Sequence, residues 1–159
     1  MRYAHAMILI VYCLIGTAAA APAKVGFSAE PAEVHTYDFV EVTVRVTDPD
    51  VGNPFTDASV RGHFQLGDGT PVEVDGFCDS EDGGVYRIRF MPSETGRYTY
   101  AVTYRQDGFE RTHEGSFRAV ASDGKGLLRV DPANRWHFVW EGTGEHYFWN
   151  GTTTYYLMG

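Results

Sequence analysis

The chain has 159 residues with 13 basic and 21 acidic side chains, so its formal net charge is −8. This acidic balance argues against nucleic acid or an anionic membrane surface as a partner, because both require a basic patch. The length excludes a complete (β/α)8 barrel, which needs at least about 200 residues. With 43% hydrophobic and 21% charged residues, the composition is that of a globular protein of one domain and a fraction.

Residues 1–23 have the pattern of a secretory signal peptide. Arg2 is the only charged residue before Lys24, residues 6–16 are apolar, and small residues follow. A positive start, a short apolar centre and a small-residue site are typical of such signals. We expect cleavage after Ala20 or Ala23, followed by secretion or release into the periplasm, away from the membrane. The alternative is an uncleaved anchor, but this apolar run reaches only about 16 Å as a helix, roughly half of the hydrocarbon core.

Residues 24–121 are predicted to form an all-β domain, an immunoglobulin-like β-sandwich of about seven strands. Apolar and polar residues alternate with period 2 throughout, and no stretch has a helical period. The expected strands are residues 24–29, 39–47, 60–66, 72–75, 86–90, 98–104 and 111–120. Turn residues separate them at the spacing of a sandwich.

One local motif supports the immunoglobulin-like prediction. Residues 92–98 (PSETGRY) resemble a tyrosine corner, in which Tyr98 hydrogen-bonds to upstream backbone. The Cys…Trp…Cys pattern of antibody domains is absent from the sequence. Signal cleavage removes Cys13 and leaves Cys78 alone, so we expect a packed thiol and no internal disulfide.

Local motifs predict no cofactor and no metal. Asp48, Asp50, Asn53 and Asp57 offer oxygen ligands to Ca²⁺, but their spacing lacks the glycine and the final bidentate Glu of an EF-hand loop. Turn formation explains the same residues. The histidines after the signal have no zinc-motif spacing: His35, His63, His113, His137 and His146.

No catalytic constellation is visible in the sequence. Paired carboxylates are the signature of glycoside hydrolysis, and Glu141 and Glu145 are the only acids after Asp131. They flank Gly142-Thr143-Gly144, which predicts a tight turn, so we interpret them as solvated turn residues.

The composition changes after residue 121. Residues 122–135 are predicted to be a linker, and short strands are expected at residues 127–130 and 136–140. Residues 136–159 contain all three tryptophans and eight of the 23 aromatic residues. Asn150-Gly151 predicts a two-residue hairpin. The sequence stops within an apolar run at residues 155–159, which favours a truncation inside a buried strand.

Two segments carry a resemblance to a known family. VDGFCDSEDGGVYRIRFMPSETGRYTYAV and HFVWEGTGEHYFWNGTTTYYLMG resemble the N-terminal Ig-like domain, catalogued as a domain of unknown function, of predicted secreted glycoside hydrolases. In that family the sandwich precedes a (β/α)8 catalytic barrel. The resemblance covers residues 25–159 and implies that residues 136–159 are the truncated start of the barrel. It also implies that the catalytic carboxylates lie on later barrel strands, so no catalytic residue is assigned to this chain.

Two functions follow as hypotheses. The first is a non-catalytic accessory domain that packs against the missing barrel, shapes its substrate cleft and is not itself an enzyme. The second is a carbohydrate-binding module with polysaccharide as its partner, or another surface-interaction domain. In either case clustered aromatic residues would form the contact surface. The candidate contact residues are Trp136, Trp140, Tyr147, Phe148 and Trp149.

Overall fold

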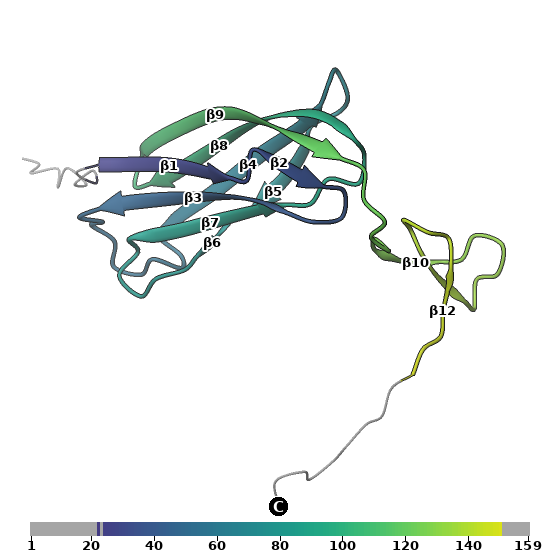
Figure 1. Ribbon diagram of the computed structural model, residues 1–159. Coiled ribbons are helices and arrows are strands. Elements are labelled where there is room, and N and C mark those ends of the chain that lie inside the picture. The colour runs from purple at the N-terminus through teal and green to yellow at the C-terminus, as the bar shows by residue number, and fades with distance from the viewer. Residues whose placement is uncertain (1–21, 23, 151–159) are drawn as a thin grey trace, which may run out of the picture.

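The computed structural model describes residue 22 and residues 24–150. The predicted signal peptide therefore lies outside the described residues, apart from residue 22. Of the predicted turn at Asn150-Gly151 only Asn150 is described, and the strand expected after it lies outside the described residues. Those described residues form twelve strands in three sheets and no helix. Figure 1 shows two of these sheets facing each other, with the third attached beyond them through a connecting segment. The prediction of an all-β protein is confirmed.

The first sheet has four strands in the order β1-β3-β7-β6. Every neighbouring pair is antiparallel. The strands are β1 (Lys24–Glu30), β3 (Val40–Thr47), β7 (Val85–Phe90) and β6 (Phe77–Cys78). Alternating valines in β3 are buried because one face of this sheet covers the core.

The second sheet has five strands in the order β2-β9-β8-β4-β5. Its pairs are antiparallel, apart from the short β2, which runs parallel to β9. The strands are β2 (Glu33–His35), β9 (Phe109–Val120), β8 (Gly96–Gln106), β4 (Ala58–Leu66) and β5 (Val72–Asp75). The chain crosses from the first sheet to the second between β1 and β2, through the cis peptide Glu30–Pro31.

Aromatic contacts between the two sheets form the centre of the core. Phe64 of β4 stacks on Phe90 of β7 with ring centroids 4.4 Å apart. Tyr86 of β7 meets Tyr104 of β8 edge-on at 5.3 Å. Burial raises the pKa of both tyrosines, and their hydroxyls have partners: that of Tyr86 donates to the Pro54 carbonyl and that of Tyr104 to the Gln106 side chain. The sheets therefore pack face to face as a β-sandwich.

All seven predicted strands are present, and the structure adds the short strands β2 and β6. The tyrosine corner is also present, because the hydroxyl of Tyr98 donates to the carbonyl of Glu94 over 3.1 Å. The predicted alternation of buried and exposed residues is only partly correct in β5. Val72 was expected on an apolar face, but it is half exposed because β5 is an edge strand with a neighbour on one side only.

An ion-pair network covers the outer face of the first sheet. Glu41 of β3 accepts hydrogen bonds from Arg87 and Arg89 of β7, and Arg87 also contacts Asp79. Burial alone raises the pKa of Glu41, but hydrogen bonds from Arg89 and Arg87 and their charges outweigh it, so this pKa lies below its ordinary value. The carboxylate is only 18% exposed, so screening by water is limited.

We expect Glu41→Gln to lower the free energy of unfolding by about 1 kcal/mol at pH 7. A carboxyl whose folded-state pKa is depressed stabilises the fold above its unfolded-state value, 4.5 for Glu41, and this stability is lost as pH falls through the folded-state pKa. The difference between wild type and variant should therefore shrink below about pH 4.5. Urea unfolding at pH 7, 5, 4 and 3 measures it.

The matched control is Glu110→Gln, because Glu110 pairs with Arg105 but is half exposed. Its effect should be smaller at every pH. A Glu41→Gln difference that stays constant from pH 7 to pH 3 would contradict the charge-based explanation.

Candidate functional site

The third sheet contains the predicted contact residues and has strand order β10-β11-β12. Its strands are β10 (Leu128–Val130), β11 (Phe138–Trp140) and β12 (His146–Tyr147), all antiparallel. The turn between β11 and β12 is the predicted one at residues 141–145, closed by a hydrogen bond from the Gly144 amide to the Trp140 carbonyl at 2.7 Å. β10 and β11 correspond to the short strands expected at residues 127–130 and 136–140, and they pair with each other.

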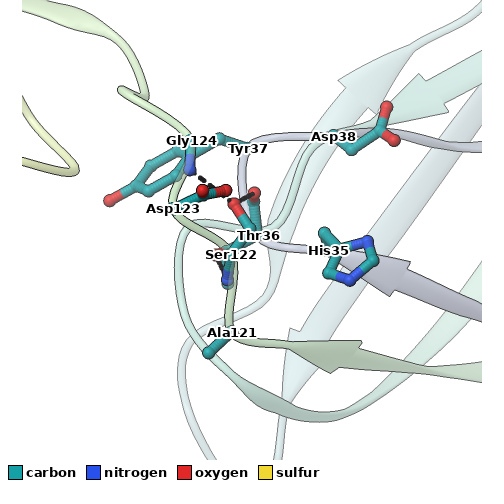
Figure 2. A pocket seen from close by; sticks show the side chains of 8 residues that line it. All are labelled: His35, Thr36, Tyr37, Asp38, Ala121, Ser122, Asp123 and Gly124. Carbon is teal, nitrogen blue, oxygen red and sulfur yellow. Dashed lines mark hydrogen bonds between the residues drawn. The ribbon is translucent and has the colours of Figure 1, made fainter.

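The segment before this sheet is held against the sandwich. Thr36 and Ser122 line an open hollow of about 500 Å³. Figure 2 shows these two residues meeting, with His35 and Asp38 on one side and Gly124 on the other. The Ser122 hydroxyl donates to the Thr36 carbonyl at 2.9 Å, and the Ser122 amide donates to the Thr36 hydroxyl at 3.3 Å. The first residues after β9 are therefore tied to the β2–β3 turn.

The aromatic ring of Tyr37 connects the sandwich to the third sheet. A Cβ added to Gly126 or Gly142 would lie 2.9 Å or 2.8 Å from this ring, so only glycine allows the close approach at both positions. Tyr37 itself has φ of 66°, a conformation that is uncommon outside glycine. The contact places the ring between the start of the third sheet and its hairpin turn.

The strand register divides the side chains of the third sheet between two faces. Directly paired residues share a face, and alternate residues along a strand change face. The pairs Leu128–Trp140, Val130–Phe138 and Phe138–Tyr147 place apolar residues on one face. The pairs Arg129–Val139 and Val139–His146 define the opposite, more polar face. The sheet is amphipathic.

Aromatic contacts continue along the apolar face. Trp140 meets Tyr147 edge-on at 5.4 Å, Tyr147 meets Trp149 at 6.2 Å, and Phe138 meets Trp149 at 6.1 Å. The ammonium of Lys125 lies 5.9 Å from the centre of the Trp140 ring, within the range of a cation–π contact. The predicted residues Trp140, Tyr147 and Trp149 are thus brought together, with Phe138 as a member that the sequence reasoning missed.

The other two predicted aromatic residues do not belong to this contact set. Trp136 is 91% exposed and Phe148 is 85% exposed. Trp149 is also 68% exposed even though it contacts two rings. An apolar surface of this kind is typical of an interface or a ligand-binding surface.

A second cluster lies on the polar face and was missed by the sequence reasoning. Asp131 follows β10, His137 precedes β11 and His146 begins β12. One ligand atom from each residue lies within 4.8 Å of the others. The carboxylate of Asp131 is only 10% exposed: Oδ1 accepts the Ala133 amide at 2.8 Å, and Oδ2 lies 3.2 Å from Nε2 of His146.

The pKa of Asp131 lies below its ordinary value, because the Ala133 amide hydrogen bond stabilises the carboxylate, with further contributions from Asn134 and His146. The sequence spacings, six residues and then nine, match no local zinc motif. The hairpin register could have revealed the cluster, because it pairs His146 with Val139, two residues from His137. The absence of a local zinc motif, noted in the sequence, does not separate these three residues in space.

The turn proposed as an alternative Ca²⁺ site is occupied by its own hydrogen bonds. Asp57 accepts the Asn53 amide at 2.7 Å, and the Asn53 side chain accepts the Phe55 amide at 3.1 Å. The pKa of Asp57 is lowered chiefly by the Asn53 backbone hydrogen bond. Among the described residues, Asp48, Asp50 and Asp57 form no metal-ligand group with one another, so the turn interpretation accounts for the side-chain contacts.

Glu141 and Glu145 each form an ion pair. Glu141 contacts Arg129 at 3.3 Å, and Glu145 contacts Lys125 at 3.4 Å. Cys78 is half-buried, and its thiol donates to the Ser80 carbonyl at 3.1 Å. These contacts are those of turn carboxylates and a packed thiol.

In the described part of the chain no helix is long and apolar enough to cross a membrane.

The structure therefore defines a β-sandwich that carries a small amphipathic sheet with exposed aromatic side chains. Residues 33–105 match the sequence family described as Domain of unknown function (DUF5060), a stretch that runs from β2 through most of β8. No curated protein matches the chain.

Two solved structures were compared with the chain. The crystal structure of a predicted glycoside hydrolase from Bacteroides vulgatus ATCC 8482 is 30% identical, with a TM-score of 0.64, over 79% of this chain and 23% of that chain. The chain thus spans under a quarter of that protein's length. The Lin-41 filamin domain aligns over 64% of this chain and 98% of its own with 17% identity and a TM-score of 0.41, a level at which no functional conclusion follows.

Proposed function

We propose that this protein is the non-catalytic, immunoglobulin-like accessory module of a longer, exported glycoside-hydrolase-like protein. The apolar face of the third sheet would pack against the catalytic domain and shape one rim of its substrate cleft. The similarity to a predicted glycoside hydrolase more than three times as long supports a larger parent. The signal-peptide pattern of residues 1–23 supports export.

The observation that carries the proposal is the amphipathic third sheet. Its apolar face joins Phe138, Trp140, Tyr147 and Trp149 through ring contacts. Burying one such ring stabilises an interface by about 2–3 kcal/mol at roughly 25 cal/mol per Å². Tyr37 and the Thr36–Ser122 hydrogen bonds hold the segment that bears this sheet against the sandwich. A module attached in this way can position a neighbouring domain.

The alternative function is carbohydrate binding, or contact with another surface, through the same aromatic residues. Sugar rings stack on exposed aromatic faces, and the high exposure of Trp136 and Trp149 favours this candidate. The two functions differ in what covers the rings: protein in the first, a polysaccharide in the second. They can therefore be separated by experiment.

The test compares the chain with a longer protein extended by the codons that follow Gly159 in the genomic DNA. If the third sheet packs on a catalytic domain, amide exchange at residues 138–147 should slow by at least tenfold in the longer protein. Trp149→Ala should lower the Tm of the longer protein and leave that of the chain unchanged. Equal exchange in both proteins would overturn the proposal.

A binding measurement tests the alternative function directly. Retention of the chain on a panel of insoluble polysaccharides, abolished by Trp149→Ala, would favour the carbohydrate-binding module over the accessory role. Phe55→Ala is the matched control, because Phe55 is an equally exposed aromatic residue on the sandwich. The accessory role predicts no retention of either variant or of the wild type.

A further inference from the structure

We propose that Asp131, His137 and His146 bind one divalent transition-metal ion, with Zn²⁺ as the preferred ion, on the polar face of the third sheet. The three residues lie at the end of β10, before β11 and at the start of β12. One bound ion would thus connect all three strands. This site lies on the face opposite the aromatic residues, so it is separate from the contact surface proposed above.

The donor set favours zinc over the common hard cations. Two imidazole nitrogens and one carboxylate oxygen are ligands that Zn²⁺ prefers, whereas Ca²⁺ and Mg²⁺ require mainly oxygen ligands. Three protein ligands leave the fourth tetrahedral position for a water molecule or for a donor atom from another molecule. Nearby positive charge is neutralised, since Arg129 on the same face pairs with Glu141 at 3.3 Å.

The geometry is close to that of a bound site. Zinc–ligand distances of about 2.0–2.2 Å place tetrahedral ligand atoms roughly 3.4 Å apart. Oδ2 of Asp131 and Nε2 of His146 are already separated by 3.2 Å, and all three ligand atoms lie within 4.8 Å. A movement of the His137 side chain toward the other two ligands would complete the set, and this side chain is exposed.

Neighbouring groups position the ligands. Asp131 is buried and is fixed by its Oδ1 bond to the Ala133 amide, so its second oxygen remains directed at His146. The Asn134 side-chain nitrogen lies 3.2 Å from Nδ1 of His137, and the Asn134 oxygen accepts the Trp136 amide at 3.4 Å. Binding of the ion through Nε2 of His137 would place the ring proton on Nδ1, so Asn134 would have to turn its oxygen to this nitrogen and give up the Trp136 contact.

A bound metal ion would also stabilise the third sheet. The strands of the third sheet are three, three and two residues long, and sheets this short are marginally stable without a further constraint. Ligands from three strands would hold the sheet together on the side opposite its aromatic face. Zinc binding should therefore order the surface that presents Trp140 and Trp149.

The experiment uses the untagged chain, titrated with ZnCl₂ in an isothermal calorimeter at pH 7.5. We expect one site per chain, and at least tenfold slower amide exchange at residues 128–147 when zinc is bound. His137→Ala and His146→Ala should weaken binding at least tenfold. Asp131→Asn should do the same while retaining the hydrogen bond to the Ala133 amide, which separates metal binding from folding of the turn.

His63→Ala is the matched control, because His63 is exposed beside Glu73 in the second sheet. This variant should bind zinc as the wild type does, and CaCl₂ should not compete. Absence of stoichiometric binding, or equal binding by His146→Ala and His63→Ala, would overturn the proposal. Circular dichroism of each variant checks that the sandwich remains folded, and the Asp131→Asn variant tests the site without removing the Ala133 hydrogen bond.

Discussion

Truncation of Phe64 to alanine is expected to lower the free energy of unfolding by about 3–5 kcal/mol. Phe64 has no exposed surface, and its ring stacks on Phe90 and lies 5.7 Å from the Tyr100 ring. The substitution removes the aromatic contact between the two sheets that has the shortest centroid distance among the described residues, and it leaves a cavity. Such a loss is a large fraction of the stability of a typical domain, about 5–15 kcal/mol.

Chemical denaturation followed by far-ultraviolet circular dichroism measures the Phe64→Ala effect, since the signal reports on the sandwich strands. Phe55→Ala is the matched control: its ring is 67% exposed in the turn before β4, and its removal should change the stability by less than about 0.5 kcal/mol. Similar losses for the two variants would show that the Phe64–Phe90 stack is not the centre of the core.

The sandwich core could be predicted because its strands are long and bury one face. In β3 the four valines that alternate with polar residues are all buried, as period-2 patterning requires. Tyr98 was predictable for a second reason, because the corner motif is local in sequence. Both features depend on neighbouring residues and not on contacts distant in the chain.

The missed strands lack that kind of signal. β2 has one buried residue, Val34, and pairs with β9 more than 80 residues later. β6 has only two residues, Phe77 and Cys78. Alternation cannot be recognised over two or three positions, and the parallel pairing of β2 depends on the tertiary fold. Short strands with distant partners therefore cannot be found from local patterns.

The two candidate sites, the aromatic surface and the Asp131 cluster, also differ in how far the sequence could predict them. Composition alone indicated the aromatic residues, because the tryptophans concentrate between residues 136 and 149. It could not separate Trp140 and Trp149, which share ring contacts with Tyr147, from Trp136, which has none in that set. The cluster of Asp131, His137 and His146 depends on how three strands align, so it required the strand register.

Gly62→Ala is expected to cost about 2–3 kcal/mol of unfolding free energy, although it adds a single methyl group. Gly62 lies in β4 and faces the core, where a Cβ would come 2.7 Å from Ile88, 2.8 Å from Phe64 and 3.2 Å from Val102. All three neighbours are fully buried. The packed core cannot move aside without displacing side chains from both sheets.

Gly26→Ala is the matched control, because it lies in β1 with no atom within 4 Å of an added Cβ. Denaturant unfolding should show it to be neutral or slightly stabilising, since alanine restricts the unfolded chain more than glycine does. A Gly62→Ala loss no larger than that of Gly26→Ala would contradict the packing argument. The same comparison excludes a general cost of replacing strand glycines.

A double variant identifies the cause of the Gly62→Ala loss. In Gly62→Ala/Phe64→Ala the missing ring leaves space for the new methyl group, so the cost of Gly62→Ala should fall by about 1 kcal/mol or more relative to the wild-type background. The Ile88 contact persists, so the cost should not vanish. Strict additivity of the two substitutions would instead place the strain at Ile88 and Val102.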